Sequence, residues 1–366
     1  MRHTLLDLEP NEHVPRAALE GILESLREED LEKSRRAAAF GDQQDLLSAE
    51  YKETLRQIVG PAPFDALRHI RDERQEKWAA IIEACGLGLE GQSRWEKLRN
   101  ETIAAAARVI AEAGVDPEKI RAQQLLYRDK AGTMFAEYLG KDLLADDRPM
   151  IKNLDYYPPF SGAYSTGHSY ITPSRALPVN NPYADAASGE FGAELSSTLY
   201  GASDSEWSLA SRESSILQWH RMGGTGALQV QVQVRTMDAR NWGSVWDEWG
   251  WSNLNLFQQC RPFARLLYPF RSPLVYTNAL AFSVYAGGGF IYQDTNNSDH
   301  SWGFAHFPAG NYQHFQVGIP GSVPVDTWAL VQVGVQAVNY FWTNDTSVYS
   351  NLKSRLRLTR LGIWHT

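Results

Sequence analysis

The sequence changes character near residue 150, and this change most constrains the fold. The first 150 residues hold 22 Lys and Arg and 29 Asp and Glu, whereas the remaining 216 hold 13 and 14. Aromatic residues follow the opposite trend, because 8 of the Phe, Tyr and Trp residues precede position 151 and 34 follow it. Such a break indicates two structural regions. We therefore predict a helical domain over 1–148, a linker over 149–165 and a β-sandwich domain over 166–366.

The first region has the periodicity of amphipathic helices, with apolar residues every three or four positions and charges between them. Asp116 followed by Pro117 is typical of a helix start, and Ser93 with Glu96 has the spacing of a capping box. The pattern predicts an all-α helical bundle or hairpin array. Its five expected helices contain residues 19–26, 47–59, 64–85, 93–110 and 116–138.

The second region alternates with the period of β-strands. Apolar and polar residues alternate over 228–235 and 331–337, and short apolar runs over 279–286 and 290–293 are separated by Gly, Asn and Pro turns. In the last segment the phase slips after Leu358, which predicts a bulge near Thr359 or Arg360. We predict an all-β antiparallel sandwich, jelly-roll-like, so the whole chain is a multidomain α plus β protein.

A Trp-rich and Asn-rich segment, 241–257, is the most distinctive local feature of this region. If the chain is extended from Trp249, then Trp249, Trp251, Asn253 and Asn255 share one face of a strand. Indole rings cover the apolar face of a sugar and amides bond its hydroxyls. The segment is a candidate ligand-binding face, and packing in a core or interface is the alternative.

Two adjacent acids in the same segment, Asp247 and Glu248, are candidate catalytic residues, because glycoside hydrolysis uses a pair of carboxylates. Neighbouring residues on a strand point to opposite faces, so these two cannot form the pair with each other. One of them would need a distant partner such as Glu206, Glu213 or Asp294. Hydrogen-bond acceptors in a loop are the alternative role.

Histidines and cations suggest two further sites. His300, His306 and His314 are weak candidates for a metal site, but their spacings match no short ligand signature, and we expect histidines on a polar sheet face. No cofactor is predicted. A basic stripe predicts either a contact with an anion or partner, or a solvated edge strand protected by cations. It consists of Lys353, Arg355, Arg357 and Arg360.

The remaining features concern location and partners. The first residues lack a secretory signal, no apolar run is long enough to span a membrane, and two cysteines fit a reducing compartment. As given, the chain is predicted to be cytoplasmic, or exported only by a route without a classical signal peptide. A net charge of −8 argues against nucleic acid as a partner, and no membrane partner is expected.

Two hypotheses for function follow. Motifs for nucleotide binding or a nucleophilic serine are missing from the sequence, which favours a non-catalytic protein. The first hypothesis is a structural or adaptor protein that self-assembles as a homo-oligomer through its helical domain and presents the sandwich to another protein or a ligand. The alternative is a carbohydrate-binding protein or glycan-active enzyme that uses the Trp/Asn-rich face.

Overall fold

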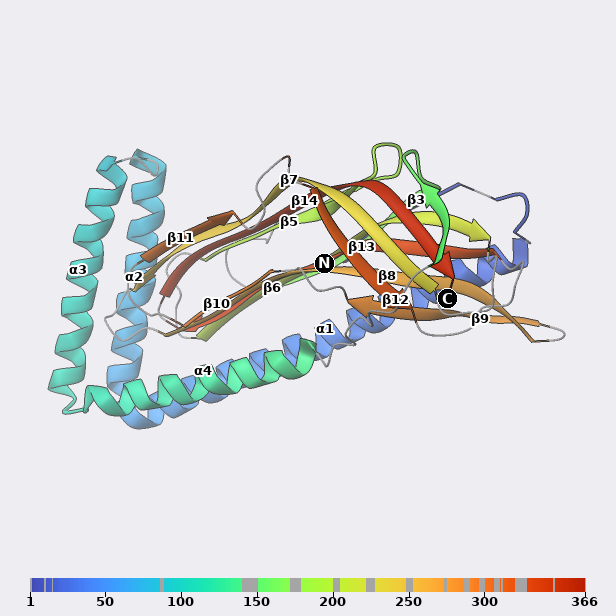
Figure 1. Cartoon of the computed structure of the whole chain (residues 1–366). Coiled ribbons are helices and arrows are strands. Elements are labelled where there is room, and N and C mark those ends of the chain that lie inside the picture. Colours follow the sequence, from blue (N-terminus) through green and yellow to red (C-terminus); the bar gives the residue numbers. More distant parts are fainter. Residues whose placement is uncertain are drawn as a thin grey trace.

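The chain folds into three layers, in which two antiparallel β-sheets face each other and helices cover the outer side of one of them (Figure 1). The predicted fold class, helices followed by an antiparallel sandwich, is confirmed. The computed structural model describes residues 2–9, 11–14, 16–85, 89–139, 151–171, 179–199, 205–221, 228–247, 253–272, 275–285, 290–295, 300–305, 310, 312–319, 328–344 and 346–365.

Within these residues the helical region contains α1 (Arg16–Val59), α2 (Pro61–Cys85), α3 (Leu89–Glu112) and α4 (Pro117–Leu139). The prediction of five helices is wrong, because the first two stretches join in α1. Ser93 lies inside α3 and does not start it. The start of α4 is confirmed, since the Asp116 carboxylate accepts a hydrogen bond from the Glu118 N–H at 3.0 Å. No helix in the described part of the chain is both long and apolar enough to cross a membrane.

The strands of the described residues form two sheets in which every pairing is antiparallel. Sheet A has the order β1 (Arg2–Leu8), β3 (Gly162–Ile171), β6 (Ser205–Arg221), β13 (Trp328–Asn344), β8 (Asn253–Ser272) and β10 (Phe290–Asp294), with β9 (Val275–Tyr285) also on β8. Sheet B has the order β11 (His300–Ala305), β7 (Leu228–Asp247), β14 (Thr346–His365), β5 (Glu190–Leu199) and β4 (Val179–Asp185), with β12 (Tyr312–Ile319) on β7 and β2 (Ile151–Tyr156) on β14.

Strands flank the helices on both sides in the sequence. β1 pairs with β3 so that Arg2 lies opposite His168. The segment predicted as a linker, 149–165, contains β2 and the start of β3. The chain therefore leaves sheet A after β1, forms the four helices, and rejoins the sandwich at β2 and β3.

The alternation predicted for β7 and β14 places one face of each strand in the core. Val230, Val232 and Val234 are buried between the sheets. The bulge in β14 is confirmed, because its register with β7 shifts between Leu358 and Arg360. β14 lies between β7 and β5, so the basic stripe does not protect an edge strand, and that alternative is wrong.

Helices α1 and α4 pack on the outer face of sheet A largely through aromatic rings. The Phe135 ring of α4 stacks on the Tyr340 ring of β13, with centroids 4.1 Å apart. Phe40 of α1 contacts Tyr340 at 5.7 Å, and the Trp207 indole N–H donates to the Asp45 carboxylate at 2.8 Å. Large aromatic side chains supply much of the burial that attaches a helix to a sheet, so this cluster fixes the helical layer.

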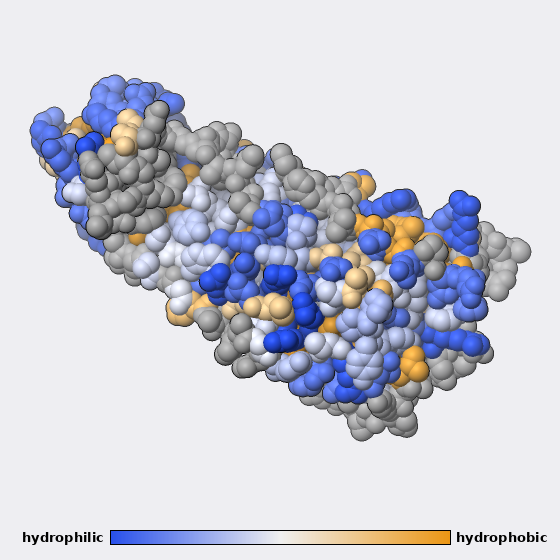
Figure 2. Space-filling view, turned by 90° about the horizontal axis from the view of Figure 1, so that it is seen from above, coloured by the Kyte–Doolittle hydropathy of each residue, from blue (hydrophilic) through white to orange (hydrophobic). Residues whose placement is uncertain are grey.

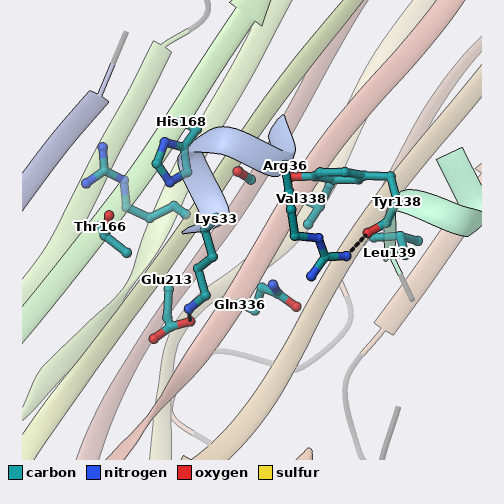
Figure 3. A pocket seen from close by; sticks show the side chains of 11 residues that line it. Lys33, Arg36, Tyr138, Leu139, Thr166, His168, Glu213, Gln336 and Val338 are labelled. Atoms are coloured by element: carbon teal, nitrogen blue, oxygen red, sulfur yellow. Dashed lines mark hydrogen bonds and ion pairs between the residues drawn. The ribbon is translucent and has the colours of Figure 1, made fainter. Parts of the chain in front are cut away.

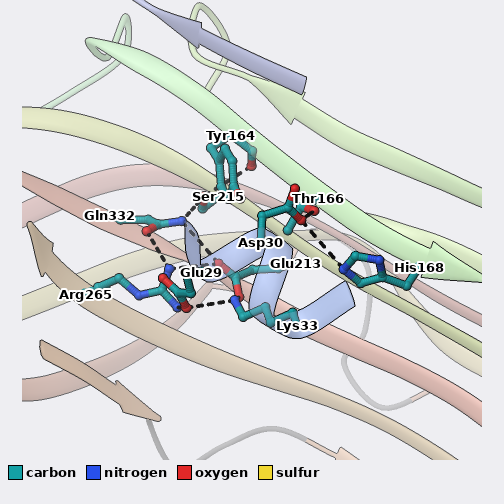
Figure 4. Close-up of polar contacts among 10 residues, drawn as sticks. All are labelled: Glu29, Asp30, Lys33, Tyr164, Thr166, His168, Glu213, Ser215, Arg265 and Gln332. Carbon is teal, nitrogen blue, oxygen red and sulfur yellow. Dashed lines mark hydrogen bonds and ion pairs between the residues drawn. The ribbon is translucent and has the colours of Figure 1, made fainter. Parts of the chain in front are cut away.

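A buried charged network fixes the first half of α1 to the same sheet (Figure 4). The Glu213 carboxylate of β6 accepts from the Lys33 ammonium at 2.6 Å and from the Arg265 guanidinium at 3.1 Å. Burial by itself raises the pKa of Glu213, but Arg265 and Lys33 outweigh it and hold the pKa well below its usual range. Nearby, the Thr166 hydroxyl donates to the Asp30 carboxylate. The contacts of Lys33 and Asp30 with the sheet join residues more than 130 positions apart.

Candidate functional site

An open cleft lies at the end of the sandwich where α1 begins, opposite the end occupied by α2 and α3 (Figure 1). Its volume of about 610 Å³ falls in the range of roughly 300 to 1,000 Å³ that is common for small-molecule sites. We call it the end cleft. The residues that line it are Glu9, Asn11, Glu12, His13, Leu154, Tyr156, Ser161, Gln218, Trp219, His220, Arg221 and Trp328.

One wall of the end cleft is the connection between β1 and α1. The Asn11 side-chain oxygen accepts a hydrogen bond from the His13 N–H at 2.9 Å, and the Asn11 carbonyl accepts from the Val14 N–H at 3.0 Å. Asn forms such turns readily, because its side chain mimics a backbone acceptor. Val14 is buried in an apolar cluster and anchors the turn. The side chains of Glu12 and His13 remain exposed.

Tryptophans from two adjacent strands form the floor. Trp219 of β6 is buried, and its indole N–H donates to the Glu9 carbonyl at 3.1 Å. Trp328, the first residue of β13, is half-buried and lies opposite Arg221. The His13 ring stacks on the Trp328 ring at 5.7 Å, with the planes 13° apart. The floor is therefore aromatic, while the rim is polar.

The two sheets meet at the back of the end cleft. The Tyr156 hydroxyl of β2 lies 2.7 Å from the Nδ1 atom of His220 on β6, which joins sheet B to sheet A. Burial raises the pKa of Tyr156 to about 12, so its hydroxyl stays protonated at neutral pH. A fixed hydroxyl and imidazole beside an aromatic floor can orient a ligand that carries hydroxyl groups.

The outer face of sheet B offers a different kind of surface (Figure 2). Hydrophilic side chains gather over the middle of this face, and those of β14 are held in ion pairs. Glu190 bonds to Arg355 and Arg357, both at 2.6 Å, and Arg360 bonds to Asp155 at 3.0 Å. The basic stripe predicted from the sequence is thus matched by carboxylates of neighbouring strands.

The predicted Trp/Asn-rich face lies partly outside the described residues, which exclude Trp249 and Trp251. The alternation is as expected, because Leu254 and Leu256 are in an apolar cluster. Asn253 and Asn255 are buried, and the Asn255 amide donates to the Arg128 carbonyl of α4 at 3.4 Å. Helix α4 therefore covers Asn255, and this asparagine does not face solvent.

The candidate catalytic acids, Asp247 and Glu248, lie only partly within the described residues. Asp247 ends β7 opposite Thr346, and Glu248 lies outside the described residues. Of the three distant partners considered, Glu213 is engaged by Lys33 and Arg265 in the buried network on the other sheet. This arrangement uses Glu213 to attach α1.

The two described histidines of the predicted cluster lie on different strands, which pair with distant parts of β7. His300 of β11 lies opposite Val245 of β7, and His314 of β12 lies opposite Gln233. These positions on β7 are twelve residues apart, or about 40 Å at 3.3 to 3.4 Å per residue. His306 lies outside the described residues, among which no group of three potential ligands gathers. His300 and His314 cannot bind the same ion.

Comparisons with known proteins place the chain in no family. No family model matches, and no curated protein matches. A solved structure from work on the promiscuous specificity of carbohydrate-binding modules of the β-sandwich superfamily shares 11% identity, with 50% of this chain and 53% of that chain covered and a TM-score of 0.17. The chain thus spans about half of that structure.

Two further structures show the same weak likeness. A structure of CBM4 shares 8% identity over 41% of this chain and 76% of that chain, with a TM-score of 0.16. The enzymatically active domain of bacteriophage CBA120 tailspike protein 4 shares 11% identity over 53% of this chain and 19% of that chain, also with a TM-score of 0.16. At these scores the likenesses define neither a ligand nor an activity for this chain.

Proposed function

We propose that this protein binds a carbohydrate in the end cleft and does not transform it. The proposal rests on the composition of the cleft, which has a tryptophan floor, amide and hydroxyl groups, and carboxylates and a guanidinium on the rim. Aromatic rings favour the C–H face of a pyranose ring, while Gln218, Asn11 and Tyr156 supply hydrogen bonds to hydroxyls. The volume of about 610 Å³ suits one or two sugar units.

The carboxylates of the end cleft support binding more than hydrolysis. Glu9 and Glu12 are both exposed, and the Glu12 side chain lies 3.5 Å from the His13 imidazole. A hydrolase places two carboxylates across the scissile bond in distinct environments, one of them shielded from solvent. Two exposed acids on one short turn act more simply as hydrogen-bond acceptors for hydroxyl groups.

A glycan array followed by titration calorimetry tests this proposal. The full chain is expected to bind a defined subset of oligosaccharides, and Trp328→Phe should weaken binding about 2- to 10-fold, since an aromatic contact contributes about 0.5 to 1.5 kcal/mol. Arg221→Gln, at the exposed rim, should also weaken it. The matched control is Trp242→Phe, on sheet B outside the cleft, which should bind as the parent does.

Further variants separate the cleft from the face predicted from the sequence. Loss of binding in Trp249→Ala or Trp251→Ala, with Trp328→Phe unaffected, would place the ligand on the Trp/Asn-rich face. A chain that binds no glycan on the array contradicts the proposed function itself.

We propose self-association through the helical layer as a second function. Leu46 of α1 is 70% exposed and Leu126 of α4 is 48% exposed, and both line a groove between these helices on the side away from sheet A. Exposed leucines on adjacent helices are typical of contact surfaces, and identical chains most often pair by two-fold symmetry. A dimer would present two end clefts and raise avidity for a repeating glycan.

Light scattering coupled to size exclusion tests self-association. The full chain is expected to elute as a dimer or larger assembly, and the double change Leu46→Gln and Leu126→Gln should shift it toward the monomer. Leu154→Gln, an exposed leucine in the end cleft, is the control. A parent chain that is monomeric at high concentration contradicts self-association and leaves the glycan proposal unaffected.

A further inference from the structure

Two hollows of the molecule differ in the balance of their charges. The small cavity beneath α1 is lined by Lys33 and Arg36, and the Lys33 ammonium bonds to the Glu213 carboxylate at 2.6 Å (Figure 3). The charged residues around it are three cations, Lys33, Arg36 and Arg265, and three carboxylates, Glu29, Asp30 and Glu213. The charges of this junction therefore balance, and it favours a ligand of neither sign.

The end cleft, in contrast, has more carboxylates than cations. Glu9 and Glu12 line it and are exposed, and Arg221 is the one Lys or Arg side chain among its described lining residues. Asp7 of β1, two residues before Glu9, is exposed as well, and alternate residues of an extended chain lie on one side. With the imidazoles neutral, three negative charges stand against one positive charge. Such a cleft attracts cations and repels anions.

The charged residues next to this rim are paired with one another. At the start of α1, the Arg16 guanidinium pairs with the Glu20 carboxylate at 2.9 Å. On the sheet B side, the Arg360 guanidinium bonds to the Asp155 carboxylate of β2 at 3.0 Å. Each of these pairs adds no net charge, so the surplus at the end cleft stays negative.

His13 shows how a flat group with N–H donors fits this surface. Its ring lies almost parallel to the Trp328 ring, with the planes 13° apart and the centroids 5.7 Å apart. Its Nε2 atom lies 3.5 Å from a Glu12 carboxylate oxygen. A tryptophan beside a carboxylate equally suits a sugar that carries an amine, because the C–H face lies on the indole and the N–H groups reach the carboxylate. An ammonium group is also attracted to the face of an indole ring.

We propose that the end cleft selects amino sugars, with the sugar ring on Trp328 and the ammonium group among the carboxylates of Glu9 and Glu12. The inference rests on the proposed carbohydrate function and deepens it by naming the class of ligand. Neutral sugars bind more weakly through the same aromatic contact. Sugars with a carboxylate bind most weakly, because the rim repels them.

Titration calorimetry of the full chain with four β-1,4-linked tetrasaccharides of one backbone tests this selectivity. The probes are cellotetraose and the tetramers of glucosamine, N-acetylglucosamine and glucuronic acid. All are measured at pH 7, where imidazoles are mostly neutral. A fraction of the amines is protonated in solution, and contact with carboxylates raises that fraction.

The order of affinities is the expected result. The glucosamine tetramer should bind about 3- to 30-fold tighter than cellotetraose, which is the range for one exposed ion pair and one cation–π contact. The N-acetylglucosamine tetramer should bind like cellotetraose, because the acetyl group removes the charge. The glucuronic acid tetramer should bind more weakly than cellotetraose. Raising the salt concentration to 1 M should reduce these differences by screening.

Charge-removing variants locate the source of the preference. Glu9→Gln and Glu12→Gln should each reduce it, and the double variant should bring the glucosamine tetramer within about 2-fold of cellotetraose. Affinity for cellotetraose should change little, because a glutamine amide still bonds to hydroxyl groups. The control is Glu118→Gln, an exposed side chain at the start of α4, which removes the same charge far from the cleft and should keep the preference.

The outcomes separate this inference from the proposed function. Equal affinities for the glucosamine tetramer and cellotetraose, or a preference that survives the double variant, overturn the selection of amino sugars and leave carbohydrate binding standing. A preference that falls equally in Glu118→Gln overturns it too, since the net charge of the chain then explains the effect. If none of the four probes binds, the selection of amino sugars is overturned, and the glycan array decides separately whether the chain binds any carbohydrate.

Discussion

Two carboxylates on opposite sides of the molecule have nearly the same geometry and very different surroundings. Glu213, on the outer face of sheet A, contacts Lys33 and Arg265 beneath α1, and Arg265 is 3% exposed. Glu190, on the outer face of sheet B, contacts Arg355 and Arg357, which are 40% and 36% exposed. Because the charge-to-charge distances are similar, the comparison isolates the effect of removing an ion pair from water.

The largest effect is expected where sheet A packs against aromatic rings. Phe135→Ala removes the ring that stacks on Tyr340 and should lower the free energy of unfolding by about 3 to 5 kcal/mol. Urea titration monitored by circular dichroism measures this change. Tyr312→Ala, an exposed ring on sheet B, is the control and should change stability by less than about 0.5 kcal/mol. Equal losses in both variants would remove the distinction between the covered and the open sheet.

The buried ion pair should give the next largest effect. Glu213→Gln leaves Lys33 and Arg265 with Glu29 as their remaining carboxylate. We expect the free energy of unfolding to fall by about 3 kcal/mol, because removing one partner leaves a buried charge uncompensated. The same urea titration measures it. A loss below about 1 kcal/mol would mean that water or Glu29 fully compensates.

The contribution of Glu213 should also depend on pH. The folded state holds the pKa of Glu213 below its ordinary value of 4.5, so its stabilisation is complete above about pH 4.5 and is lost as the pH falls through the lower folded value. Melting temperatures recorded from pH 7 to pH 2 should show the parent and Glu213→Gln converging at the acid end. Parallel curves would contradict this assignment.

The smallest effect is expected on sheet B. Glu190→Gln should cost about 0.5 to 1 kcal/mol, because its arginine partners remain solvated when the carboxylate is removed. Raising the salt concentration to 1 M should reduce this cost further by screening. Melting temperatures of parent and variant at low and high salt measure both effects, and a cost that equals that of Glu213→Gln would show that burial is not the deciding difference.

The sequence predicted the elements that repeat locally and missed the contacts between distant segments. The strands around Val230 and Leu358, the bulge after Leu358 and the start of α4 follow from patterns within a few residues. The length of α1 does not, because residues 27–36 are mostly charged and lack an apolar stripe. Two of these residues have sheet partners far along the chain: Glu213 is 180 positions from Lys33, and Thr166 is 136 positions from Asp30.

The candidate site was missed for a related reason. The end cleft is assembled from segments around Asn11, Tyr156, Trp219 and Trp328, none of which is distinctive alone. Trp328, a single tryptophan at the start of β13, did not stand out in the sequence beside the dense Trp cluster at 242–251. Alternation correctly placed Asn253 and Asn255 on one side of β8, but it could not show that α4 covers Asn255.

The pairing of β1 with β3 has a consequence for how the chain is made. Leu8 and Gly162 are adjacent in the sheet, so a ribosome adds about 150 residues between the first strand and the one that receives it. At roughly 5 to 20 residues per second, the leading strand waits on the order of 8 to 30 s for its neighbour to be translated. The helices emerge during that wait, and Phe40 and Phe135 lack their shared sheet partner until Tyr340 of β13 has been translated.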